Sequence, residues 1–268
     1  MIESLVTNIR LFLLIFFRII ALMELAPLVS SSSIPQLAKI GMAFFISASV
    51  FPSVLAGHPV IPTGALDYGL TVLGEVAIGL LLGFLLNLIF TGFQLAGQLF
   101  SLQMGFSASE VFDPLSQVEI PLMGEFLNLV AMLVFLTTAG MSKFLLVGVQ
   151  KSFQYLTAMD LVTHRTGIIS LLINGLGGLF QSALTISFPI LGTLLLVSVA
   201  MGLLARAAPQ MDILTMGFPV SIGVSFLLLF ATMPFLMTAM ERIIDGSFQS
   251  LSGFITTAGS LGAGSSGR

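Results

Sequence analysis

The stretch LTVLGEVAIGLLLGFLLNLIFTGF, residues 70–93, decides the class of fold, because it is strongly apolar and carries a single charge, Glu75. It is longer than the ~20 apolar residues that one membrane-spanning helix needs. Comparable apolar runs follow one another along the rest of the chain, and each predicts a helix: residues 5–23, 38–54, 126–149, 168–204 and 213–240. The sequence therefore predicts an all-α integral membrane protein.

The composition supports this prediction and excludes several functions. Hydrophobic residues make up 56% of the 268 residues and charged residues 8%, whereas soluble domains carry about 25% charge. The net charge of −3 without a basic cluster argues against nucleic-acid binding. The chain has no cysteine and no HExxH, GxSxG or Walker motif. We therefore predict a non-enzymatic protein without a cofactor or bound metal, in contact with membrane lipid.

A polar, loop-like interruption, QLAGQLFSLQMGFSASEVFDPLSQVEIPLMGEFLN (residues 94–128), divides the apolar runs. It contains four acids, no Lys or Arg, and two prolines, which disfavour helix. A non-helical segment at membrane depth must be buried in protein or line an aqueous cavity. The sequence therefore predicts a passage-lining loop. Its candidate gating residues are Met104, Gly105, Phe106, Ser107, Phe112, Asp113, Pro114, Pro121 and Met123.

Charges inside the first apolar run need an explanation. Arg10 and Arg18 lie on one broad face of the predicted helix. Intramembrane charges usually face a bundle interior and are paired. No partner within the chain is evident from the sequence, so we expect the two arginines to snorkel or to pair with another subunit.

Glu75, Gly79 and Gly83 follow one another at helical spacing. The two glycines form a small-xxx-small pattern, which lets helix backbones approach closely. A carboxylate on the same face suggests a tight contact that hydrogen-bonds it. A proton-relay role for Glu75 is the alternative interpretation.

A compact polar break, RAAPQMD, separates the last two apolar runs. Arg206 and Asp212 could form an ion pair across the turn that Pro209 favours. The segment is either a solvated turn or a docking site for a partner.

The longest run, residues 168–204, exceeds the length of one span and contains Pro189 and a glycine cluster. We expect a helical hairpin or a strongly kinked helix there. For the domain organisation we expect a single domain over residues 1–250. Residues 251–268 have the composition of a flexible Gly/Ser-rich tail, native or artificial.

Several blocks together resemble the FliR family of flagellar biosynthesis proteins. They are APLVSSSSIPQLAKIGMAF, GEVAIGLLLGF, QLAGQLFSLQMGFS, FDPLSQVEIPLMGEFLNLVA and SFPILGTLLLVSVAMGLLARAAPQMDILTMGFP. They occur in the family's order between about residues 5 and 245. The related virulence-type export subunits match less well in the QMGFS and FDPLS blocks.

The resemblance implies a subunit of the type III secretion export gate in the bacterial inner membrane, at the flagellar basal body. Its implied partners are FliP-like, FliQ-like and FlhB-like subunits, with unfolded flagellar proteins as the exported substrate. It implies kinked helical hairpins in a helical assembly, part of it raised above the bilayer. Residues 105–123 would then be the plug of the gate. One departure is Met141-Ser142-Lys143, where many members carry a basic or histidine pair.

A small-molecule or ion transporter is the rival interpretation. It would predict inverted repeats and broken helices in matching halves. The long broken run and Glu75 agree with it, but the sequence shows no such symmetry.

Overall fold

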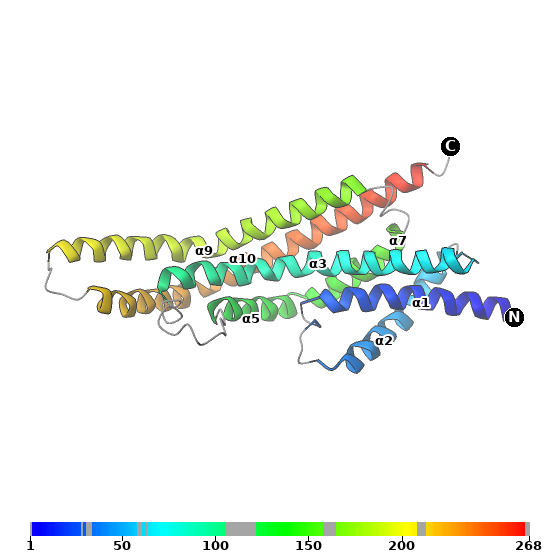
Figure 1. Cartoon of the computed structure of the whole chain (residues 1–268), viewed down its shortest axis with the longest axis horizontal. Helices are drawn as coiled ribbons and strands as arrows, with labels where there is room; N and C mark the ends of the chain where they lie inside the picture. The colour runs from blue at the N-terminus through cyan, green and yellow to red at the C-terminus, as the bar shows by residue number, and fades with distance from the viewer. Residues whose placement is uncertain are drawn as a thin grey trace. The chain divides into compact units, whose positions relative to one another are not determined.

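The computed structural model is helical wherever it has regular secondary structure in the residues that it describes, which are 2–27, 29–30, 34–57, 61–62, 64–105, 122–157, 165–207 and 213–265. Figure 1 shows these elements along the chain. They are α1 (Ile2–Leu25), α2 (Gln36–Leu55), α3 (Ala65–Met104), α5 (Leu122–Thr137), α6 (Gly140–Lys143), the π-helix η1 (Phe144–Lys151), α7 (Ser152–Tyr155), α9 (Arg165–Ala207) and α10 (Ile213–Ser265).

Five of the described helices, α1, α2, α3, α9 and α10, are long and apolar enough to cross a membrane. A sixth span results if α5 and the segment Gly140–Tyr155, which are bent by 76° at a short break, are counted as one. The prediction of an all-α integral membrane protein is therefore confirmed.

The third helix is longer than its apolar run. Residues 94–104 belong to α3 and residues 122–128 to α5, so the loop-like interpretation is wrong for both ends of the interruption. Glutamine is a good helix former, and Gln94 is held by a hydrogen bond to Glu125 of α5. Helical packing thus continues where hydropathy alone suggests that the helix ends.

The fourth apolar run does not form the single helix that the sequence predicts. Helix α5 ends at Thr137, and the chain turns at Ala139, which has a left-handed φ of 54°. The Thr138 hydroxyl donates to the carbonyl of Val134. Because a left-handed residue cannot continue a right-handed helix, the chain leaves Ala139 in a new direction.

The fifth and sixth runs also differ from expectation. Residues 165–207 form one continuous helix around Pro189, so the helical-hairpin alternative is wrong. Helix α10 continues to Ser265, past residue 251, where the sequence predicts the start of a flexible tail; that tail stays a prediction. Buried Leu251 and Ile255, one turn apart, give this part of α10 an apolar face that packs.

The chain forms two compact units, residues 1–88, 139–176 and 245–268 in unit 1, and residues 89–138 and 177–244 in unit 2. The division falls within the helices α3, α9 and α10. The fully buried apolar core of unit 1 includes Ile15, Ile19, Leu22, Ile78 and Leu82, and that of unit 2 includes Phe93, Phe100, Met104, Leu127 and Ile186. The one-domain expectation for residues 1–250 stays a prediction.

Candidate functional site

The closest helix contact in unit 1 is built on glycine. Gly79 and Gly83 of α3 lie against α1: a Cβ on Gly79 would collide with the carbonyl oxygen of Arg18, and one on Gly83 would lie 2.6 Å from the carbonyl oxygen of Leu22. Both obstacles are backbone atoms, which cannot move aside as a side chain can. Only glycine therefore permits this approach of α1 and α3.

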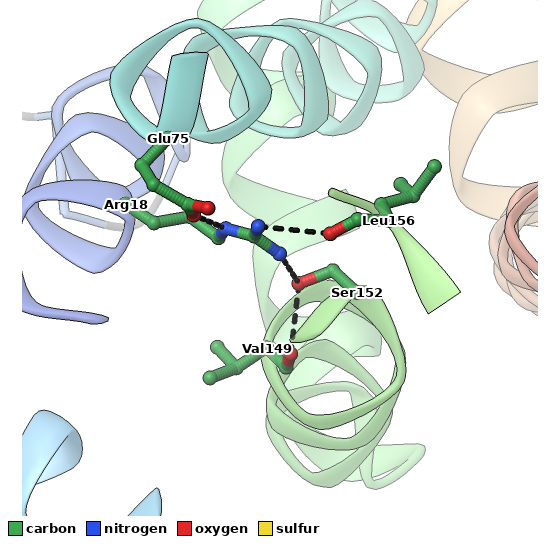
Figure 2. Close-up of polar contacts among 5 residues, drawn as sticks. All are labelled: Arg18, Glu75, Val149, Ser152 and Leu156. Atoms are coloured by element: carbon green, nitrogen blue, oxygen red, sulfur yellow. Dashed lines mark hydrogen bonds and ion pairs between the residues drawn. The ribbon is translucent and has the colours of Figure 1, made fainter. Parts of the chain in front are cut away.

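Arg18 lies beside this contact and joins three segments of the chain, as Figure 2 shows. Its Nε donates to the carboxylate of Glu75 in an ion pair. Nη1 donates to Ser152 Oγ at 3.4 Å, and Nη2 donates to the carbonyl oxygen of Leu156 at 2.9 Å. The guanidinium also lies 4.0 Å from the centroid of the Phe153 ring. Glu75 and Arg18 thus neutralise each other within the chain.

The burial of this ion pair determines how much its loss would destabilise the protein. Arg18 is 2% exposed and Glu75 8% exposed. Removing one partner of a buried ion pair usually costs about 3–5 kcal/mol, because the other charge stays buried without compensation. The expectation that Arg18 needs a second subunit is wrong, because Glu75 lies 57 residues away in sequence but adjacent in space. For Glu75 this arrangement favours structural pairing over a proton relay.

Sequence reasoning missed the other side of the cluster. Ser152, Phe153 and the Leu156 carbonyl lie more than a hundred residues from Arg18, in a segment with no distinctive pattern. Two further missed contacts tie the same segment to α10: Lys143 forms an ion pair with Asp245, and Lys151 Nζ donates to Ser252 Oγ at 2.7 Å. A signal was present, because Lys143 and Lys151 are the only Lys or Arg residues between Ile40 and Arg165.

The remaining predicted charges are placed as follows. Arg10 lies over the ring of Tyr68, 5.7 Å from its centroid, and the Tyr68 hydroxyl donates to the Arg10 carbonyl at 3.0 Å. Arg10 therefore also has neighbours within its own chain. Arg206 lies in the last turn of α9, where a positive charge is favourable to the helix dipole. Asp212 lies outside the described residues, so its pairing with Arg206 stays a prediction.

Both ends of the interruption are held in unit 2. Met104 at the end of α3 is 1% exposed, and Met123 at the start of α5 is 8% exposed. A Cβ on Gly97 would lie 2.6 Å from the Cα of Gly124, so α3 and α5 meet backbone to backbone. Gln94 Nε2 donates to Glu125 Oε1 at 2.7 Å beside this contact. The loop therefore begins and ends at a closely packed base.

Gly105, the last described residue before the loop, has a φ of 82°, which glycine adopts without strain. The ring of Phe218 in α10 fills the space where a Cβ would lie. A larger residue at position 105 would thus be strained and would displace Phe218. The other candidate gating residues lie outside the described residues: Phe106, Ser107, Phe112, Asp113, Pro114 and Pro121.

The described parts of the chain hold no group of three or more His, Asp or Glu side chains that could bind a metal ion. Buried polar side chains such as Arg18, Glu75 and Ser152 link different helices. Together with the long apolar helices, this defines a multi-pass helical membrane protein whose polar groups hold its helices together.

Comparison with known proteins gives the family. The model of the bacterial export proteins, family 1, matches residues 9–247. The chain belongs to this family.

Several curated relatives are similar over most of their length. The chain is 30% identical to the flagellar biosynthetic protein FliR of Bacillus subtilis over 253 residues, covering 92% of this chain and 95% of the relative. It is 30% identical to FliR of Escherichia coli over 240 residues, covering 89% and 90%. The surface presentation of antigens protein SpaR of Shigella flexneri is 29% identical over 222 residues, covering 80% of each chain.

Proposed function

We propose that this protein is a non-enzymatic subunit of the flagellar type III export gate in the bacterial inner membrane, and that unfolded flagellar components pass through the gate. The observation that carries the proposal is the similarity to FliR proteins over about nine-tenths of the chain, together with the family match. The helical membrane fold supports it, because a gate subunit needs spans and helix contacts rather than a catalytic centre.

The burial of the helices supports an assembled state. In the most apolar windows of α9 and α10, 11% and 17% of the residues are buried, compared with 50% in α3. Side chains such as Leu196 and Phe230 are 67% and 85% exposed. Apolar surface of this extent is covered by lipid or by other proteins. We propose FliP-like, FliQ-like and FlhB-like subunits as the partners, at the flagellar basal body, with part of the protein raised above the bilayer.

Co-purification tests the assembly. A tagged full-length chain expressed with FliP-like and FliQ-like subunits should be recovered with both, and without them it should be degraded or should aggregate. A native mass spectrum of the purified complex would measure the composition. A long-lived, monodisperse single chain in detergent and liposomes would contradict the gate proposal and favour the transporter alternative.

The loop at residues 105–123 is proposed as the plug of the gate. Its sequence combines apolar side chains that can seal, among them Met104, Phe106 and Met123, with Pro114 and Pro121, which disfavour helix. A hydrophobic constriction blocks ions by excluding water. The packed base formed by Gly97 and Gly124 supports the proposal, because it would hold the ends of the loop while its middle is displaced.

Deleting residues 107–117 tests the plug. The described base lies outside the deletion, so we expect the complex to assemble and small-ion leakage through the membrane to rise. The measurement is conductance or small-molecule uptake, with recovery of the complex determined in parallel. Normal assembly without added leakage would show that the loop does not seal the gate. Loss of assembly would show that the loop has a structural role.

A virulence-type secretion gate is the second candidate, and the similarity to SpaR favours it. Complementation distinguishes the two. The flagellar assignment predicts restored motility in a strain that lacks its FliR, and no restored secretion in a strain that lacks its SpaR-type subunit.

A further inference from the structure

The π-helix η1, residues Phe144–Lys151, is the least usual backbone element among the described residues. π-helices are rare, occur mostly as single turns within α-helices, and are frequent at functional sites. A π-helical turn accommodates more residues than an α-helical turn, so it changes the direction of every side chain that follows it. An element of this kind needs outside contacts that favour it over the α-helix.

At the C-terminal end of η1, two of those contacts come from Arg18. The Ser152 hydroxyl donates to the carbonyl of Val149, within η1, at 2.8 Å. A hydroxyl has one proton, so Ser152 Oγ acts as the acceptor for Arg18 Nη1. The second contact, to the Leu156 carbonyl, holds the chain one turn further on. Arg18 therefore contacts Ser152, which directly follows the π-helix, and Leu156, one turn later.

Helix α10 contacts both ends of η1. At the N-terminal end, Lys143, which directly precedes η1, pairs with Asp245 of α10, and at the C-terminal end Lys151, the last residue of η1, donates to Ser252 of α10. In the middle of η1, a Cβ on Gly148 would lie 3.6 Å from a methyl group of Leu22 in α1. The N-terminal end of η1 is thus held by α10, and the C-terminal end by both α10 and Arg18 of α1.

A change of helix type would break the contacts at the C-terminal end of η1, those of Arg18 among them. Each residue of an α-helix turns by about 100° around the axis, and a π-helical turn contains one residue more per hydrogen-bonded ring than an α-helical turn. If η1 became α-helical while its N-terminal end stayed in place, Ser152 and Leu156 would turn away from α1. The guanidinium of Arg18, 2% exposed, would keep Glu75 and lose both other hydrogen-bond partners.

We propose that Arg18 is a positioning residue that selects the π-helical register of residues 144–151, with Glu75 orienting its guanidinium. Residues 144–151 then have two registers, and the hydrogen bonds from Arg18 to Ser152 and Leu156 favour the π-helical one. This role concerns the conformation of the chain and holds for any function of the protein.

Thiol crosslinking measures the register directly. Because the chain contains no cysteine, only the introduced cysteines react. Leu22→Cys is combined in turn with Val147→Cys, Gly148→Cys and Val149→Cys, in the full chain, in membranes that contain its partner subunits. A short bismaleimide is added, and the linked peptides are quantified by mass spectrometry. With Arg18 present, the pair at 22 and 148 should give the highest yield.

Arg18→Met keeps an unbranched, flexible side chain and removes the donors. We expect the ratio of the yield at 148 to the yields at 147 and 149 to fall by at least roughly tenfold, because losing one hydrogen bond to a charged group has about this effect and Arg18→Met removes two. Ser152→Ala, which leaves the Arg18–Glu75 pair intact, should lower the ratio in the same direction by a smaller factor. It also provides the test if Arg18→Met does not accumulate.

Ser47→Ala is the matched control, since Ser47 is a fully buried serine that donates to a backbone carbonyl of its own helix and lies in the same unit. In Ser47→Ala, the ratio of the crosslinking yield at 148 to the yields at 147 and 149 should equal the ratio measured without this substitution. An unchanged ratio in Ser152→Ala, or an equal fall in Ser47→Ala, would overturn the proposal, because the register would then be independent of Arg18 or would respond to any lost hydroxyl.

Discussion

The contact between α1 and α3 is satisfied by residues of this chain. The exposed faces of α9 and α10 are not. In the first, two buried charges neutralise each other and two glycines allow the backbones to meet. In the second, large apolar side chains such as Leu196 and Phe230 have little of the chain around them. The comparison teaches that this subunit carries a self-sufficient polar contact in one place and leaves apolar surface for other molecules elsewhere.

Breaking the ion pair should have the largest effect. Arg18→Met and Glu75→Gln, each alone, should destabilise the protein by about 3–5 kcal/mol, because each leaves the charge of the other residue buried without compensation. Resistance of the purified complex to thermal denaturation measures the loss. The combined change, Arg18→Met with Glu75→Met, should cost less than the sum of its parts. Strict additivity would contradict a direct pair and would weaken the contrast with α9 and α10.

Filling the glycine contact should have an intermediate effect. Gly79→Leu or Gly83→Leu should cost about 1–3 kcal/mol, the usual range for overpacking, and should lower the yield of the complex. Gly69→Leu is the control in the same helix, since a Cβ there would meet nothing within 4 Å. If all three variants gave the same yield, the face of α3 that carries Gly79 and Gly83 would not pack against α1.

Changing the outward face should affect the stability of the chain least. Phe230→Ser should change it by about 0.5 kcal/mol or less, as for surface positions without special contacts, while lowering recovery with FliP-like or FliQ-like subunits. Tagged co-purification measures this, with Phe235→Ser, 77% exposed on the same helix, as a second position. A stability loss comparable to that of Arg18→Met would show that α10 is internally packed and would remove the contrast.

The helices were predictable where hydropathy changes sharply and were mispredicted where packing decides. All six apolar runs form helices, the fourth with a break at Thr138 and Ala139. Residues 94–104 extend α3 because their partner is α5, not because they are apolar. No proline lies near the bend at Ala139, so the sequence does not predict it. The left-handed conformation of Ala139 depends on the contacts that the helical segments on either side of it make.

The sequence by itself determined the all-α membrane class, the family resemblance and the small-residue face at Gly79 and Gly83, because length, hydropathy and local spacing are properties of neighbouring residues. Only the tertiary structure decided that Arg18 pairs with Glu75 and holds Ser152 and Leu156. The physical reason is that a buried charge takes whichever partner the packing of distant segments brings within hydrogen-bond distance. The spacing of residues along the sequence therefore does not predict which partner a buried charge has.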